Sequence, residues 1–205
     1  MNLDKLKVAQ INFLAMYPGA FENLEMQEMS KRHMSDKIYF QAAEFFAKPK
    51  FEDPNEIVSN MVKIVSRSTM VSLFEKPKFR DFVNSLDDSE KKALAKGLQN
   101  FLYKDEEKGF VQMVDVLKKG KIAKWSLLTA LFFYFRPQEE VFIKPTTTKG
   151  VIEYFEIENL KYSPSPTYAF YKAYRELIKQ MKSEVDASLY PNNAAFSGFL
   201  MMSLP

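Results

Sequence analysis

The sequence contains no cysteine, a single histidine and only six glycines among its 205 residues. Without cysteine the chain can form neither a disulfide bond nor a thiolate metal site, a pattern that is typical of a reducing compartment. His33 has no second histidine with which to complete a multi-histidine centre or the paired Glu-x-x-His motifs of di-iron helical bundles. We therefore expect no metal site, and we predict that His33 is a surface or structural residue.

The six glycines are widely separated, and no Gly-x-Gly sequence occurs anywhere in the chain. This excludes the dinucleotide-binding fingerprint and the P-loop, because both need closely spaced glycines to bring backbone amides against phosphates. The nucleophile elbow of serine hydrolases is absent as well. We therefore expect no cofactor and assign no catalytic residue, and the sequence favours a protein that is not an enzyme.

Long hydrophobic runs are also scarce. The most hydrophobic one, Ile122 to Phe135, is shorter than the roughly 20 apolar residues that a membrane span needs. A helix that is apolar on all faces and too short for a membrane is typical of the centre of a globular core. We predict a buried central helix over about residues 121–135, ended by Pro137, which contributes the core residues Trp125, Leu128, Leu131, Phe132 and Phe135.

The rest of the chain shows capping signals followed by apolar residues at steps of three and four, which is a helical pattern. Asp53, Asp87 and Asp105 are predicted to begin helices, and Gly120 is predicted to end one as a left-handed cap. We predict an all-α fold, an irregular array of about ten helices around the central one. Residues 1–205 are expected to form a single helical domain, with a subdivision near residue 105 as the alternative.

Positive charge is concentrated between Lys118 and Lys149. This segment contains seven lysines and arginines but only two glutamates, although the whole chain carries a net charge of only +3. The segment Lys144 to Lys149 is predicted to begin a helix with a threonine cap, so hydroxyls, free amides and lysines would meet there, as in an anion site. We predict an anion-binding surface made of Lys118, Lys119, Lys121, Lys124, Lys144, Thr146, Thr147, Thr148 and Lys149. The alternative is ordinary capping with solvated lysines at the ends of a buried helix.

Three functions agree with these patterns. The first is a non-catalytic binding module for nucleic acid or another polyanion, which would use residues 118–149. The second is a protein-interaction or scaffold domain that associates with a protein partner or with itself through the apolar segment Phe196 to Leu200. The third is an enzyme whose polar site includes Glu139, Glu140, Lys144 and Tyr162, although a solvated turn is the simpler interpretation of the two glutamates.

Several motifs resemble a family of uncharacterised bacterial helical proteins of about this length. The motifs are KWSLLT (124–129), FRP (135–137) and FIKPT (142–146), together with YPGAF (17–21) and YSP (162–164). The resemblance extends over most of the chain and implies helical content but no activity. Met1-Asn2-Leu3-Asp4 does not begin the basic and then apolar pattern of a signal peptide, so we expect a cytoplasmic location without a membrane partner.

Overall fold

All regular structure is helical in the computed structural model, which describes residues 1–32 and 35–205. This confirms the predicted all-α fold of about ten helices. The α-helices of this part are α1 (Leu3–Met16), α2 (Leu24–Arg32), α3 (Ser35–Phe45), α4 (Pro54–Arg67), α5 (Glu75–Ser85), α6 (Asp88–Tyr103), α7 (Glu106–Lys119), α8 (Trp125–Phe135), α9 (Pro145–Tyr154), α10 (Tyr168–Ser183) and α11 (Asn193–Met202). The 3-10 helices are η1 (Ala20–Glu22), η2 (Lys48–Glu52) and η3 (Ala187–Leu189).

Three helix starts follow the predicted aspartates. Asp53 precedes α4, Asp87 precedes α6 and Asp105 precedes α7, and each carboxylate accepts a hydrogen bond from a backbone amide of the first turn. At α6 the cap is reciprocal, because the Glu90 carboxylate also accepts from the Asp87 amide at 3.3 Å. These caps satisfy amides that have no partner inside the helix, so the predicted starts are confirmed.

The predicted left-handed cap at Gly120 is wrong. Gly120 has a φ of −88°, and Lys121 after it takes the left-handed conformation with a φ of 56°. The glycine is needed for space instead of for its backbone freedom, because a Cβ atom at Gly120 would lie 2.3 Å from the ring of Phe82. Because this turn precedes it, helix α8 begins at Trp125 and not near residue 121.

Helix α8 is buried on almost every side. Trp125, Leu128, Leu131 and Phe132 are at most 1% exposed, as predicted, whereas Phe135 at the end of the helix is half-buried. The Phe132 ring stacks on Phe101 of α6 with 3.5 Å between the ring centroids. Aromatic contacts of this kind add to the stabilisation that comes from burying the rings.

The polar residues of α8 have partners inside the core. The Thr129 hydroxyl donates to the Trp125 carbonyl at 2.7 Å and accepts from the Ile143 amide at 3.0 Å. The Ser126 hydroxyl donates to the Glu75 carboxylate at 2.7 Å. The bond from Ile143 fixes the segment between α8 and α9, residues 136–144, against the central helix, and we call this segment the connector.

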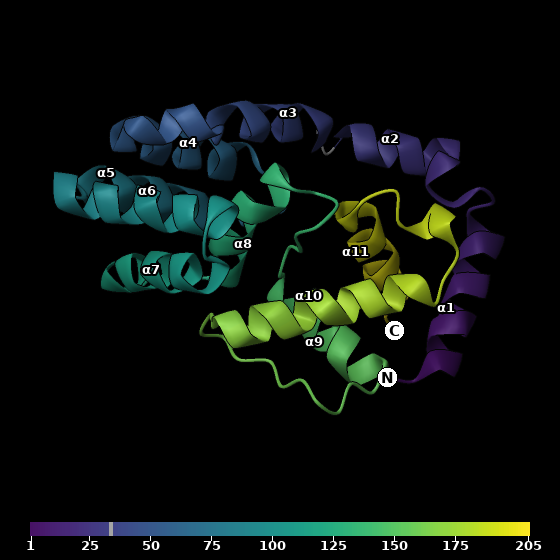
Figure 1. Ribbon diagram of the computed structural model, residues 1–205. Helices are drawn as coiled ribbons and strands as arrows, with labels where there is room; N and C mark the ends of the chain where they lie inside the picture. The colour runs from purple at the N-terminus through teal and green to yellow at the C-terminus, as the bar shows by residue number, and fades with distance from the viewer. Residues whose placement is uncertain (33–34) are drawn as a thin grey trace.

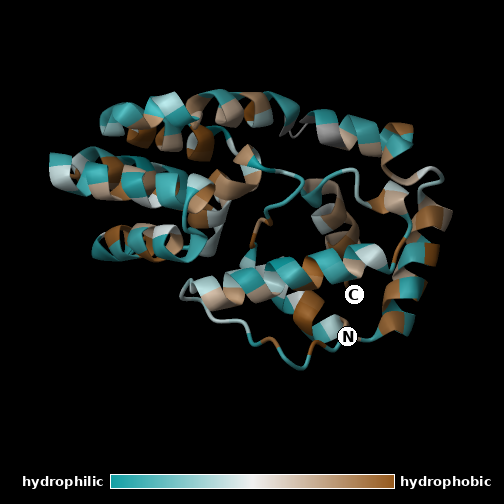
Figure 2. Ribbon diagram, viewed as in Figure 1, coloured by the Kyte–Doolittle hydropathy of each residue, from teal (hydrophilic) through white to brown (hydrophobic). Residues whose placement is uncertain are grey.

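Figure 1 shows α2, α3 and α4 along one side of the molecule, with α5, α6 and α7 beside α4, with α9 and α10 on the opposite side, and with α11 between α2 and α10 in this view. Helix α1 packs on α11, where Phe13 meets Phe199 edge to face at 5.3 Å. Bands of hydrophobic and hydrophilic residues run along α6, α7 and α10 (Figure 2), as in helices that bury one face. Among the described residues, none of the helices combines the length and the hydropathy that crossing a membrane requires.

Candidate ligand-binding cavity

A cavity of about 470 Å³ is lined by residues of α2 and α3 and by residues of α11. The ring of Tyr134, near the end of α8, and the ring of Phe142, in the connector, form part of its wall. Lys144 and Met201 also line the cavity and are exposed, so it opens to solvent. Its wall is thus assembled from segments that are distant in the sequence.

Methionine is the most frequent residue type in the cavity wall. Among the residues that the structure describes, five methionines line it: Met26, Met29, Met70, Met201 and Met202. Methionine side chains are flexible and polarizable, and they adapt their shape to apolar partners. The apolar part of the wall therefore suits a flexible hydrophobic group.

Charged and hydroxyl-bearing residues supply the polar part of the wall. Lys144, Thr147 and Tyr174 come from the connector, α9 and α10, whereas Lys31 and Asp36 come from α2 and α3. Burial raises the pKa of Tyr174 to about 12, so its hydroxyl stays protonated at neutral pH and can donate a hydrogen bond.

The start of α9 borders the cavity at Lys144 and Thr147. Lys144 is the N-cap and makes no side-chain capping bond, and Pro145 is the first helical residue. The predicted threonine cap is therefore wrong, because the proline fixes the helix start before the threonines. The first amides of a helix have no partner inside it, so Thr146 and Thr147 present amides at this end.

Thr148, in the first turn of α9, is only 1% exposed. Its hydroxyl lies beside that of Tyr174, yet its oxygen makes no hydrogen bond of ordinary geometry with any described residue. A buried polar atom without a hydrogen-bond partner lowers the stability of the fold. The region between Thr148 and the cavity wall at Tyr174 is therefore a candidate position for a ligand atom.

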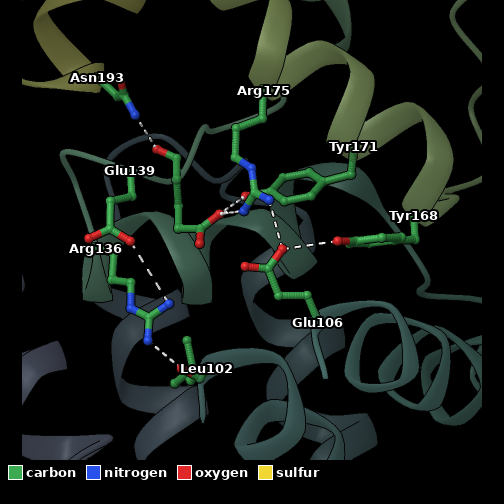
Figure 3. Close-up of polar contacts among 9 residues, drawn as sticks. Leu102, Glu106, Arg136, Glu139, Tyr168, Tyr171, Arg175 and Asn193 are labelled. Carbon is green, nitrogen blue, oxygen red and sulfur yellow. Dashed lines mark hydrogen bonds and ion pairs between the residues drawn. The ribbon is translucent and has the colours of Figure 1, made fainter. Parts of the chain in front are cut away.

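A buried ionic network holds the connector in place behind the cavity. One oxygen of Glu140, which is 0% exposed, accepts from the Tyr171 hydroxyl at 2.7 Å and from the Arg175 guanidinium at 2.8 Å. Arg175 also pairs with Glu106 of α7 at 2.7 Å, and Figure 3 shows the Glu106 carboxylate between Arg175 and Tyr168, whose hydroxyl donates to it at 3.0 Å. Asn193 donates to the backbone carbonyl of Glu140 at 2.7 Å, which joins the connector to α11.

The two carboxyl groups of this network have opposite pKa shifts. Burial raises the pKa of Glu140, and the hydrogen bonds and charge that Tyr171 and Arg175 supply offset this only in part. Burial also opposes ionisation of Glu106, but the hydrogen bond and the charge of Arg175 outweigh it and lower its pKa. The second oxygen of Glu140 is buried and has no hydrogen-bond partner among the described residues. The network therefore positions the backbone of the connector, but it leaves one buried oxygen atom without a hydrogen bond, which lowers stability.

The lysines of the predicted anion-binding surface have different surroundings. Lys119 pairs with Glu90 at 2.7 Å, and Lys118 lies 3.8 Å from Asp115. Lys121 and Lys124 are exposed, and the Lys149 amine lies over the Tyr162 ring at 5.2 Å from its centroid. Of the predicted residues, Lys144 and Thr147 line the cavity, Thr146 is exposed and Thr148 is buried.

Other candidate residues from the sequence also have clear positions. Glu139 is exposed, but Glu140 is fully buried, so the solvated-turn interpretation is wrong for Glu140. The segment Phe196 to Leu200 buries Phe196, Phe199 and Leu200 within the chain, so these side chains form no exposed apolar patch. His33 lies outside the described residues.

Comparison of the chain with protein-family models, with curated proteins and with solved structures gives no significant match.

Proposed function

We propose that the protein binds a small amphipathic molecule in the cavity between α2, α3 and α11. The observation that carries this proposal is the cavity itself, with a volume of about 470 Å³ and a largely apolar wall that a few polar side chains interrupt. Binding sites for small molecules are typically concave, roughly 300–1,000 Å³ in volume, and mostly apolar with a few polar groups that orient the ligand.

The proposal predicts that filling the cavity from α11 blocks binding. Gly198 lines the cavity, and a Cβ atom there would meet only the tip of the Phe21 ring at 4.0 Å, so side chains are accommodated. We expect Gly198→Leu to weaken binding of the neutral dye Nile red by at least about tenfold, or about 1.4 kcal/mol. Dye fluorescence titrated against protein concentration measures this.

Two controls separate filling of the cavity from damage to the fold. Gly198→Ala places a small group at the same position and should bind Nile red nearly as well as the unaltered protein. Ala15→Leu adds a comparable side chain on the exposed face of α1 and should leave binding unchanged. Equal binding by Gly198→Leu and the unaltered protein, with both folded by circular dichroism, would exclude the cavity as the site.

A second candidate function, binding of nucleic acid or another polyanion, is supported by contacts that link the starts of α8 and α9. The Lys149 amine lies over Tyr162, whose ring is 5.8 Å from that of Phe170. Phe170 is in turn 5.2 Å from Trp125, which follows Lys124. This chain of rings connects two exposed lysines, and its half-buried ring, Tyr162, is the one placed to stack on a base beside a bound phosphate.

For this second candidate we predict that Lys124→Glu/Lys149→Glu abolishes binding of single-stranded and duplex DNA, measured by fluorescence anisotropy at low salt. The affinity of the unaltered protein for duplex should fall with salt, with a log–log slope of about −0.9 for each phosphate neutralised. The matched control, Lys7→Glu/Lys37→Glu, changes the net charge equally on α1 and α3 and should retain binding. If both double variants lose the same amount of DNA-binding affinity, the loss is caused by the change in net charge and not by these two lysines.

A further inference from the structure

We infer that the molecule bound in the cavity is an anion, an apolar chain that ends in one carboxylate or phosphate group held at the start of α9. This inference rests on the proposed function and adds the chemical class of the ligand and the orientation in which it binds. Three independent features of the described residues support it: the charges of the wall, the free amides of α9, and the buried hydroxyl behind them.

The charged residues of the cavity wall favour an anion. Among the described residues, the wall contains two lysines, Lys31 and Lys144, and one acidic residue, Asp36, so this part of it carries more positive than negative groups. Lys144 forms no ion pair with any carboxylate in the part of the chain that the structure describes. Its amine is therefore available to a ligand, unlike that of Lys119, which Glu90 already neutralises.

The start of α9 adds directional donors beside this amine. Because Pro145 has no N–H and Lys144 supplies no capping side chain, the amides of Thr146 and Thr147 are open to an acceptor from outside the helix. The helix dipole places partial positive charge at the same end. Together with the Lys144 amine, these groups form the kind of donor set that binds carboxylates and phosphates.

The buried hydroxyl of Thr148 is a separate indication. It lies in the same turn, 1% exposed, beside the hydroxyl of the cavity residue Tyr174, and among the described residues its oxygen has no hydrogen-bond partner of ordinary geometry. An acceptor oxygen at this end of the cavity would offer a partner to these two hydroxyl groups, each of which can donate one hydrogen bond. The methionine-rich wall would then surround the apolar chain, so the cavity provides a polar end and an apolar body.

The test compares four decyl compounds that differ only in their head groups. Decanoate, decyl phosphate, 1-decanol and decyltrimethylammonium are each titrated against the complex of the full chain with Nile red, and loss of dye fluorescence gives their affinities. We expect decanoate and decyl phosphate to bind roughly tenfold or more tightly than 1-decanol, as is usual when hydrogen bonds involve a charged group. Decyltrimethylammonium should bind most weakly.

Lys144→Gln and Lys149→Gln form a matched pair of variants on one helix. Both lysines are exposed, but only Lys144 lines the cavity, whereas the Lys149 amine lies over Tyr162. We expect Lys144→Gln to weaken decanoate binding by about tenfold and to leave 1-decanol binding unchanged. Lys149→Gln should leave both affinities unchanged.

The outcomes separate this inference from the proposal on which it rests. If Nile red and all four decyl compounds fail to bind, the cavity is not a binding site and both proposals are wrong. If decanoate and 1-decanol bind equally well, the cavity binds apolar chains but the inference of an anionic ligand is wrong. If Lys149→Gln weakens decanoate as much as Lys144→Gln does, the effect is general electrostatic attraction and the head group is not held at α9.

Discussion

Replacing Gly109 by alanine is expected to lower the free energy of unfolding by about 3 kcal/mol, near the upper end of the usual cost of overpacking. Gly109 of α7 faces Gly97 of α6, and the two helices approach at this point. A Cβ atom at Gly109 would lie 2.2 Å from the Phe101 amide nitrogen and 2.5 Å from the Gly97 carbonyl oxygen. Both are backbone atoms, so relief requires the helices to separate and not merely a side chain to rotate.

The matched control for Gly109→Ala is Gly198→Ala. Both changes are made within helices, where alanine has the better intrinsic propensity by about 1 kcal/mol. A Cβ atom at Gly198 makes only an ordinary contact with Phe21 at 4.0 Å, so this variant should unfold at an equal or higher urea concentration. Urea unfolding followed by circular dichroism measures both changes. An increase in stability in both variants would contradict the close approach of α6 and α7.

Local features of the fold could be predicted from the sequence because their causes are local. Asp87 and Glu90 are three residues apart, and their reciprocal cap forms within a single turn of helix. The central helix α8 was predictable because fourteen consecutive residues, Ile122 to Phe135, include only three polar ones. Its true start was not, since the left-handed turn at Lys121 depends on how Gly120 fits beside Phe82.

The candidate site could be predicted only in part. Lys144 and Thr147 could be predicted from the sequence, because the start of a helix has free backbone amides and this one has lysines beside it. The methionines of the wall come from α2, from the segment after α4 and from α11, and no periodicity connects them. Glu140 looked like half of a solvated pair because its partners, Tyr171 and Arg175, lie 31 and 35 residues further along the chain.

The network around Glu140 leads to the second prediction of a large effect, on Arg175→Met. The guanidinium, with a side-chain exposure of 18%, lies between the carboxylates of Glu106 and Glu140. Methionine keeps much of the apolar length of the side chain but leaves the buried carboxyl group of Glu140 without a cation. Breaking a buried ion pair by removing one partner typically costs about 3–5 kcal/mol, and we expect a loss in this range at pH 7 by urea unfolding.

A double variant identifies the cause of that loss. Glu140→Gln alone keeps an acceptor for Tyr171 and leaves the pair of Arg175 with Glu106 intact, so we expect it to cost about 1 kcal/mol or less. In the double variant Arg175→Met/Glu140→Gln no charge remains at residue 140, and part of the stability should return. If the double variant is less stable than Arg175→Met, the loss comes from packing and not from an unpaired carboxylate.

The cost of Arg175→Met should also depend on pH, and between pH 5 and pH 7 this dependence comes from Glu140. The raised pKa of Glu140 means that its contribution to stability is present below its ordinary value of 4.5 and is lost as the pH rises through the folded value. Without Arg175 that folded pKa rises further. The lowered pKa of Glu106 means that its contribution is present above the ordinary value of 4.5 and is lost only as the pH falls through the lower folded value, so removing Arg175 costs this contribution almost equally at pH 5 and at pH 7. Because of Glu140, the difference in stability between the unaltered protein and the variant should be smaller at pH 5 than at pH 7. Urea unfolding at the two pH values measures this difference, and an equal difference at both would show that the charge of Glu140 does not cause the loss.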